Sequence, residues 1–258
     1  MSGTLWRDCR FRRFWAGQTV SQFGDRVTEL ALPLLAVSTL HASAVQVSWL
    51  TALVWTPNLL ALLLGALVDR RTEKRAVMVA ADLVRAALLL TVPAAALLGT
   101  PTLVQLYAVA LLTGLASVAF GTAYPSYFAH LVPPASYIDA NSKLSASRSV
   151  SFVAGPAVGG WLVQVLSAPL AVAADALSFL ASALLIGPLP AAGPPPTRSA
   201  PPRLLRSARE GLVHLLRHPV LRAALGCAAT VNFFTGFLRG CPGLRAGEES
   251  DSCGAGQG

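Results

Sequence analysis

Seven apolar segments, each about as long as a bilayer is thick, constrain the fold of this chain more than any other feature of its sequence. They run approximately over residues 14–39, 44–68, 76–98, 102–128, 144–166, 169–189 and 220–238. A helix needs about 20 residues to cross the hydrocarbon core, and lipid offers no partner to a bare backbone N–H or C=O. A membrane β-barrel would show alternation over about ten residues, which these leucine- and alanine-rich segments lack. The sequence therefore predicts an all-α integral membrane fold embedded in a lipid bilayer.

The composition agrees with a membrane protein and argues against a nucleic-acid binder. Hydrophobic residues make up 54% of the chain and charged residues 12%, against about 45–50% and about 25% in soluble domains. The formal net charge is +8, but Lys and Arg stand in short clusters between apolar segments instead of gathering on a polar face. We interpret this charge as orientation charge and expect no nucleic-acid partner.

The positions of Lys and Arg predict the orientation of the helices. Basic residues occupy the N-terminus, the connections after the second and fourth segments, and the region 190–219, whereas "HASA", "GTP" and "SAP", beginning at residues 41, 99 and 167, contain none. Cytoplasmic loops carry the excess of Lys and Arg, so the alternation predicts a multi-pass protein with a cytoplasmic N-terminus. Arg148, near the start of the fifth segment, is expected to reach the inner membrane surface with its long side chain.

This pattern predicts five regions along the chain. They are a basic cytoplasmic N-terminus (1–13), a six-helix transmembrane bundle (14–189), a cytoplasmic Pro-rich linker with a basic amphipathic helix (190–219), a seventh transmembrane helix (220–238), and a tail rich in Gly, Ser and acid (239–258). The amphipathic helix is expected to lie on the inner membrane surface, the alternative being a solvated linker helix. We interpret the tail as disordered and aberrant, because a seventh span would leave it outside the cell.

No grouping of residues predicts an enzyme, a cofactor or a metal. The four His residues are scattered, no Gly-rich phosphate loop precedes a helix, and no Ser, His and acid grouping follows from the spacing. The four Cys residues form no CxxC pair and have no nearby His to complete a metal site.

Two motifs resemble those of the major facilitator superfamily of transporters. The stretch "GALVDRRTEKR" at 65–75 resembles the cytoplasmic signature between the second and third helices, and the matching positions are Gly65, Leu67, Asp69, Arg70 and Lys74. Thr72 and Glu73 depart from that pattern. In the fifth segment, "AGPAVGG" resembles the core of the antiporter signature at Gly155, Pro156, Gly159 and Gly160, although Ser142 and Ser151 replace its upstream glycines.

Longer stretches, "FGDRVTELALPLLAVSTLHASAVQVSWLTA" and "LVPPASYIDANSKLSASRSVSFVAGPAVGG", look like the branch that contains macrolide-efflux and enterobactin-export proteins. The resemblance implies the N-terminal six-helix bundle of a twelve-helix transporter plus the start of the second half, with the C-terminal bundle missing. It further implies the cytoplasmic membrane of a bacterium and proton-coupled efflux of an amphipathic small molecule such as a drug, a macrolide or a siderophore-like compound. The partners would be that substrate and protons, the energy source the proton gradient; no oligomeric state follows.

The resemblance also implies roles for the motif residues. Asp69 and Arg70 would form a cytoplasmic gate that closes against the second half, because acids contribute little to topology and the position of Asp69 needs another cause. The cations around it are equally well explained as solvated orientation charge. Gly155 and Gly159 allow close helix approach, and Pro156 bends the helix; packing alone explains this, whereas the family interpretation adds a seal against proton leak.

Ionisable residues inside the predicted spans are candidates for proton or substrate coupling, because charge in a membrane is costly. Asp25 and Glu29 lie four residues apart on one face of the first helix, and are expected near mid-membrane unless that helix begins later. Asp82 and Arg85 stand at i and i+3 and can form an internal ion pair. Asp175 has no obvious partner and is either a cavity residue or an interfacial one.

Two other functions remain open from the sequence. The chain can be a truncated or frame-shifted fragment that inserts in the membrane without transport activity, because the proposed gate at Asp69 needs a partner from a second bundle. It can also be a membrane scaffold or a subunit of a larger complex.

Overall fold

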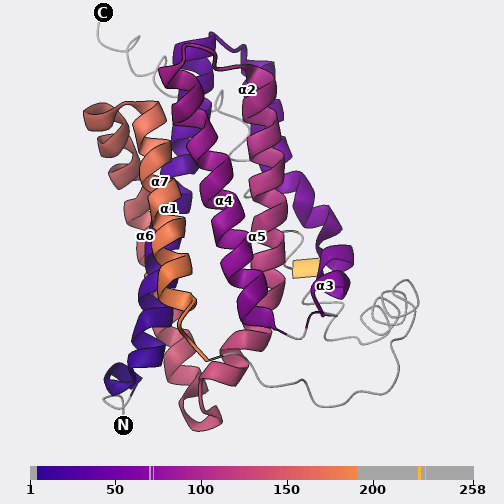
Figure 1. Ribbon diagram of the computed structural model, residues 1–258, viewed down its shortest axis with the longest axis vertical. Helices are drawn as coiled ribbons and strands as arrows, with labels where there is room; N and C mark the ends of the chain where they lie inside the picture. Colours follow the sequence, from indigo (N-terminus) through magenta and orange to yellow (C-terminus); the bar gives the residue numbers. More distant parts are fainter. Residues whose placement is uncertain (1–4, 70, 72, 191–225, 228–229, 231–258) are drawn as a thin grey trace, which may run out of the picture. The chain divides into compact units, whose positions relative to one another are not determined.

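The structure, a computed structural model, describes residues 5–69, 71, 73–190, 226–227 and 230 (Figure 1). Residues Met1–Ser199 form one compact unit, and Ala200–Gly258 form another. The elements named below all belong to the first unit. The elements are η1 (Leu5–Arg7), α1 (Cys9–Leu40), α2 (Ala44–Trp55), η2 (Thr56–Leu60), α3 (Ala61–Asp69), α4 (Lys74–Leu97), α5 (Leu103–Leu131), η3 (Pro134–Ser136), α6 (Tyr137–Leu166) and α7 (Ala168–Ile186). Over the described residues there is no strand, and the predicted all-α membrane fold is confirmed.

Six of the seven predicted segments correspond to described helices. Among the residues that the structure describes, four helices are long and apolar enough to cross a membrane, namely Lys74–Leu97, Leu103–Leu131, Pro134–Leu166 and Ala168–Ile186. α1 has 32 residues, but Asp25, Arg26 and Glu29 interrupt its apolar sequence. The predicted linker beyond residue 190 and the tail lie outside the described residues, as does the seventh segment except for residues 226, 227 and 230.

Two helices begin earlier than the apolar segments predict. α1 begins at Cys9, because the Asp8 carboxylate caps it by accepting a hydrogen bond from the Arg10 backbone N–H at 2.8 Å. α6 begins at Tyr137, and its first turns carry an ion pair between Asp139 and Lys143 at i and i+4. Hydropathy marks the apolar part of a helix, so these polar first turns were missed.

The second predicted segment, 44–68, is helical throughout, but it is not a uniform α-helix, because the 3-10 turn η2 separates α2 from α3. Pro57 stands at the start of η2, and proline supplies no backbone N–H to continue the α-helical hydrogen bonds. The break lies against α5: a Cβ at Gly114 would stand 2.7 Å from the Val54 carbonyl oxygen and 2.9 Å from Pro57 Cγ. Glycine in α5 therefore makes room for the interrupted segment.

The helices of this unit pack mainly against neighbours far apart in sequence. α7 packs against both α1 and α4, α6 packs against α1, and α5 packs against α4 and against the α2–η2–α3 segment (Figure 1). The side chains between them form two apolar cores. One contains Phe14, Met78, Tyr127, Leu144 and Ile186, and the other contains Leu35, Leu50, Leu89, Val109 and Val172.

The first of these cores joins the start of α1, α4 and α6 to the end of α3, α5 and α7, where the basic connections lie. We call this the basic end of the bundle. Arg75 does more there than supply orientation charge: its Nη1 donates a hydrogen bond to the Gly187 carbonyl oxygen at 3.1 Å and another to that of Leu189. An arginine at carbonyl groups beyond a helix C-terminus satisfies acceptors that the helix leaves unpaired. Arg75 thereby ties the start of α4 to the end of α7.

Candidate functional site

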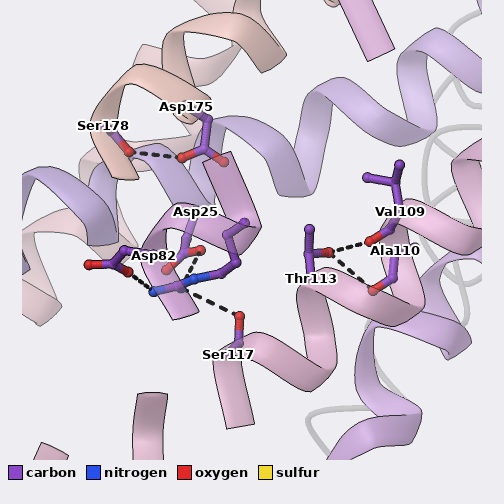
Figure 2. Close-up of polar contacts among 9 residues, drawn as sticks. Asp25, Asp82, Val109, Ala110, Thr113, Ser117, Asp175 and Ser178 are labelled. Carbon is purple, nitrogen blue, oxygen red and sulfur yellow. Dashed lines mark hydrogen bonds and ion pairs between the residues drawn. The ribbon is translucent and has the colours of Figure 1, made fainter. Parts of the chain in front are cut away.

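A cluster of charged side chains lies between the two apolar cores. The Arg85 guanidinium on α4 donates from Nη2 to Asp82 Oδ1 and from Nη1 to Ser117 Oγ on α5, at 3.4 Å. Its Nη1 also lies 3.9 Å from Asp25 Oδ1 on α1. Figure 2 shows the side chains of Asp25, Asp82 and Ser117 directed toward this one guanidinium. We call these four residues the charged layer.

The charged layer is mostly shielded from solvent. Arg85 is 4% exposed and Asp82 is fully buried. The rings of Phe179 and Phe120 cover the guanidinium, with their centroids 4.0 Å and 5.0 Å from Cζ. A buried charge is tolerated when it is paired, and aromatic faces attract a cation further. The geometry agrees with the predicted internal pair of Asp82 and Arg85, and adds Asp25 to it.

Asp25 and Glu29 of α1 have different partners. α1 spans Cys9–Leu40, so Asp25 stands near its middle, where the sequence places it. Its side chain is 43% exposed and faces Arg85, whereas Glu29 Oε2 lies 2.6 Å from Arg26 Nη1. Glu29 and Arg26 therefore neutralise each other within one turn of α1, and Asp25 belongs to the charged layer.

Asp175 lies where α7 meets α1. It is 1% exposed, and its Oδ1 accepts a hydrogen bond from Ser178 Oγ at 2.9 Å (Figure 2). Its Oδ2 has no hydrogen-bond partner among the described residues. Asp175 packs directly over Gly24, where an added Cβ would collide with Asp175 Oδ1 and Ser178 Oγ. The absence of a side chain at Gly24 is what admits this carboxyl group between the two helices.

Two cavities border the charged layer. Cavity 1 has a volume of about 420 Å³, and the surface of its wall is mostly apolar, although Asp25, Glu29 and Asp175 are part of it. Cavity 2 has a volume of about 580 Å³, with amide, hydroxyl and aromatic side chains of α1, α5 and α6 in its wall. Both are lined by the same five residues: Asp25, Arg26, Arg85, Ser117 and Gly121. Four of the five predicted coupling residues, Asp25, Glu29, Arg85 and Asp175, thus line a cavity. The fifth, Asp82, lines neither cavity and pairs with Arg85.

The cytoplasmic gate motif spans the turn from α3 to α4. Asp69 is the last residue of α3, its side chain is not described, and Arg70 lies outside the described residues. Lys74 begins α4, and its Nζ donates to the Val68 carbonyl oxygen at 2.8 Å. At Gly65, a Cβ would lie at an ordinary 3.5 Å from Thr122 Cγ2, and the Leu67 side chain is exposed. The motif therefore has the predicted position, and its gating role stays a prediction.

The antiporter-like motif packs α6 against α1. A Cβ at Gly155 would stand 2.5 Å from Arg26 Cβ, and one at Gly159 would stand 3.2 Å from Leu30 Cδ1. Both glycines are buried, whereas Pro156 is exposed and Gly160 has open space around its Cα. The close approach expected of Gly155 and Gly159 is present, and Gly155 lies beside the stem of an arginine that borders both cavities.

Several residues of the site were missed by sequence reasoning. The contact of Ser178 with Asp175 could have been predicted, because Ser178 follows Asp175 at i+3 on the same helix. Ser117 and Gly24 were not, because their roles depend on contacts with α4 and α7 respectively. Arg148 was expected to reach the membrane surface, and the structure places it in the wall of cavity 2.

Comparison with known proteins shows which family the chain resembles. The sequence pattern that defines the Major Facilitator Superfamily matches residues 14–242 of the chain. The chain is also 30% identical over 224 residues to YfiS of Bacillus subtilis (strain 168), an uncharacterized MFS-type transporter, and the match covers 84% of this chain and 52% of the relative. The chain thus spans about half the length of that curated relative.

Proposed function

The chain belongs to the major facilitator superfamily, and we propose that it acts in proton-coupled efflux of an amphipathic small molecule through a bacterial cytoplasmic membrane. The observation that supports this most is the charged layer with a cavity on each side. A transporter of alternating access needs a site near the bilayer midplane that can be reached from either face. The wall of cavity 1 combines apolar surface with carboxylates, which suits an amphipathic molecule.

Charge balance supports proton coupling at this layer. Arg26 is matched by Glu29, which leaves Arg85 as the cation that faces Asp25 and Asp82, while Asp175 lines the same cavity without an ion pair among the described residues. Carboxylates in excess of cations are costly inside a membrane, and binding a proton removes that cost. We assign the exchangeable proton to Asp25 or Asp175, because both line cavity 1 while Asp82 is fully buried against Arg85.

The conformational cycle would use the two motifs. Asp69 and Arg70 would close the basic end against helices of a second bundle, and the α3–α4 turn that carries them is tied by Lys74 to Val68. Gly155 and Gly159 would keep α6 against α1, and Pro156, inside α6, would bend that helix. In this cycle the basic end and the N-terminus would lie in the cytoplasm, which the distribution of Lys and Arg supports.

Efflux from cells tests the proposal directly. Cells that express the 258-residue chain are loaded with a fluorescent amphipathic dye, and efflux is followed before and after a protonophore collapses the gradient. We expect gradient-dependent efflux that Asp25→Asn abolishes. The matched control is Asp139→Asn, since Asp139 pairs with Lys143 and lines neither cavity. Efflux that continues unchanged in the protonophore would rule out proton coupling.

A second candidate function is that of a membrane-inserted protein that does not transport by itself. It predicts membrane-embedded protein with no efflux of any tested dye. Crosslinking in the membrane then separates the remaining cases: a product of twice the chain's mass indicates a paired half-transporter, and a stable hetero-complex after mild detergent extraction indicates a scaffold or subunit.

A further inference from the structure

We propose that cavity 2 is a binding site for an organic anion with a flat apolar body. Arg148 would attract the anionic group, Gln18 and Ser151 would donate hydrogen bonds to it, and aromatic rings would pack against the body. That this anion is also the transported molecule rests on the proposed function; the binding site itself does not.

The charges that line cavity 2 favour an anion. Its wall contains Arg26, Arg85 and Arg148, and Asp25 as its one carboxylate. Arg26 pairs with Glu29 and Arg85 with Asp82, and neither of these partners lines the cavity. Asp25 is opposed by Arg85 at 3.9 Å. Arg148 pairs with no carboxylate within the part of the chain that the structure describes, so its charge is available to a ligand.

Buried donors without partners point to the same ligand. Gln18 is 5% exposed and Ser151 is 1% exposed, and both side chains line cavity 2. Gln18 Nε2 and Ser151 Oγ have no hydrogen-bond partner among the described residues. Burying an unpaired donor costs free energy that a bound acceptor recovers. Gln22 Oε1, also unpaired and in the same wall, is an acceptor and suits a hydroxyl or N–H group elsewhere on the ligand.

The size and the aromatic wall indicate an organic molecule. Small-molecule sites measure about 300–1,000 Å³, and cavity 2, at about 580 Å³, is far larger than an inorganic ion. The rings of Tyr124 and Phe128 stack with centroids 5.7 Å apart and an interplanar angle of 6°, and Phe128 and Tyr137 lie 5.0 Å apart. All three residues line the cavity, and stacked rings offer a flat apolar surface.

Binding of two matched probes tests the proposal. The full chain is placed in nanodiscs of zwitterionic lipid, and 1-naphthoate and 1-naphthylmethylammonium are titrated calorimetrically. They share a ring system and differ in the sign of their charge. We expect naphthoate to bind more tightly than the ammonium compound. Inorganic phosphate should displace it poorly, because phosphate has no apolar body.

Variants then locate the site. Arg148→Gln should weaken naphthoate binding by at least about tenfold, the loss expected for one charge-assisted hydrogen bond, whereas Arg148→Lys should recover part of it. Ser151→Ala should weaken binding severalfold. Arg13→Gln is the matched control, because Arg13 is an exposed arginine on α1 that lines neither cavity. Arg148 is exposed and Ser151→Ala is nearly isosteric, so both variants should fold, which thermal unfolding checks.

The outcomes separate this inference from the proposed function. Equal binding of both probes, effective displacement by phosphate, or unchanged binding in Arg148→Gln would overturn the anion site. If naphthoate binding depends on Arg148 but the cells show no efflux, the site stands and the transport proposal fails. If efflux is gradient-dependent and no naphthoate binds, the transport proposal stands and the anion site fails.

Discussion

Cavity 1 and cavity 2 adjoin the same charged layer but differ in the charge and in the polarity of the side chains that line them. Cavity 1 has three carboxylates, two arginines and a largely apolar wall. Cavity 2 has one carboxylate, three arginines and a wall of amides, hydroxyls and aromatic rings. The balance of carboxylates and arginines is therefore reversed between two cavities of one bundle of helices.

The helix α1 shows how this difference arises. On one face of α1, Gln18, Ser21 and Gln22 line cavity 2, and Thr28, Glu29 and Leu32, further along the helix, line cavity 1. These residues follow one another at helical spacing, with Asp25 between the two groups. The backbone is the same regular helix throughout, so the chemistry of each cavity is set by side chains one or two turns apart. Changes at single positions can therefore alter one cavity and spare the other.

The largest effect is expected from removing Arg85, the cation of the charged layer, which lines both cavities. Arg85→Ala leaves Asp82 charged and fully buried, and loss of one partner of a buried ion pair costs about 3–5 kcal/mol. We expect a loss of stability of that size in chemical unfolding in mixed micelles. The double variant Asp82→Leu with Arg85→Met removes both charges and should recover most of the stability. A double variant no more stable than Arg85→Ala would contradict this account of the layer.

A methyl group at Gly24 should disturb the cavity 1 side of the layer. The added Cβ collides with Asp175 and Ser178, so Gly24→Ala should reduce the free energy of unfolding by about 1–3 kcal/mol, the usual cost of overpacking. Gly121→Ala is the matched control. Gly121 lines both cavities and nothing lies within 4 Å of its added Cβ, so this variant should be neutral or gain about 0.5–1 kcal/mol.

Asp175→Asn should separate the two cavities functionally. Asp175 lines cavity 1 and not cavity 2. We expect gradient-dependent dye efflux to fall by at least about tenfold, equivalent to about 1.4 kcal/mol, with naphthoate affinity unchanged. Asp139→Asn should change neither measurement. Equal losses of efflux and of naphthoate binding would show that the cavities are not independent.

The smallest expected effect is a difference in stability between variants of two buried serines. Ser151 Oγ has no partner among the described residues, whereas Ser178 Oγ donates to Asp175. In the absence of ligand, Ser151→Ala should therefore stabilise the chain by about 1 kcal/mol and Ser178→Ala should destabilise it by about the same amount. Thermal unfolding of both variants in the same detergent measures the difference. If both variants lost stability, the Ser151 hydroxyl would already have a hydrogen-bond partner.

Apolar length was enough to predict that the six described segments are helical, because lipid imposes one backbone solution on a chain that crosses it. It could not place their ends. Asp8 and the pair of Asp139 and Lys143 extend α1 and α6 through polar residues that hydropathy discounts. The break at Pro57 was visible as a residue, but whether proline kinks or divides a membrane helix depends on its neighbour, here Gly114 of α5.

The candidate site was predictable only within single helices. The pair of Asp82 and Arg85 follows from i,i+3 spacing, as does the contact of Asp175 with Ser178. The approach of Arg85 to Asp25 and Ser117 joins three helices, and no local spacing encodes it. Cavity 2 was missed for the same reason, because Gln18 and Ser151 lie on different helices and acquire meaning only where those helices meet.

The shared border of the two cavities has an electrical consequence. In the proposed alternating-access cycle, water in each cavity would carry the potential of the side to which that cavity opens, so that much of the voltage would fall across the charged layer. A unit charge that crosses the whole potential gains about 2.3 kcal/mol per 100 mV. A proton transferred between Asp25 and Asp175, or a short swing of Arg85 from one carboxylate to another, would therefore couple to the membrane voltage far more strongly than its small displacement suggests.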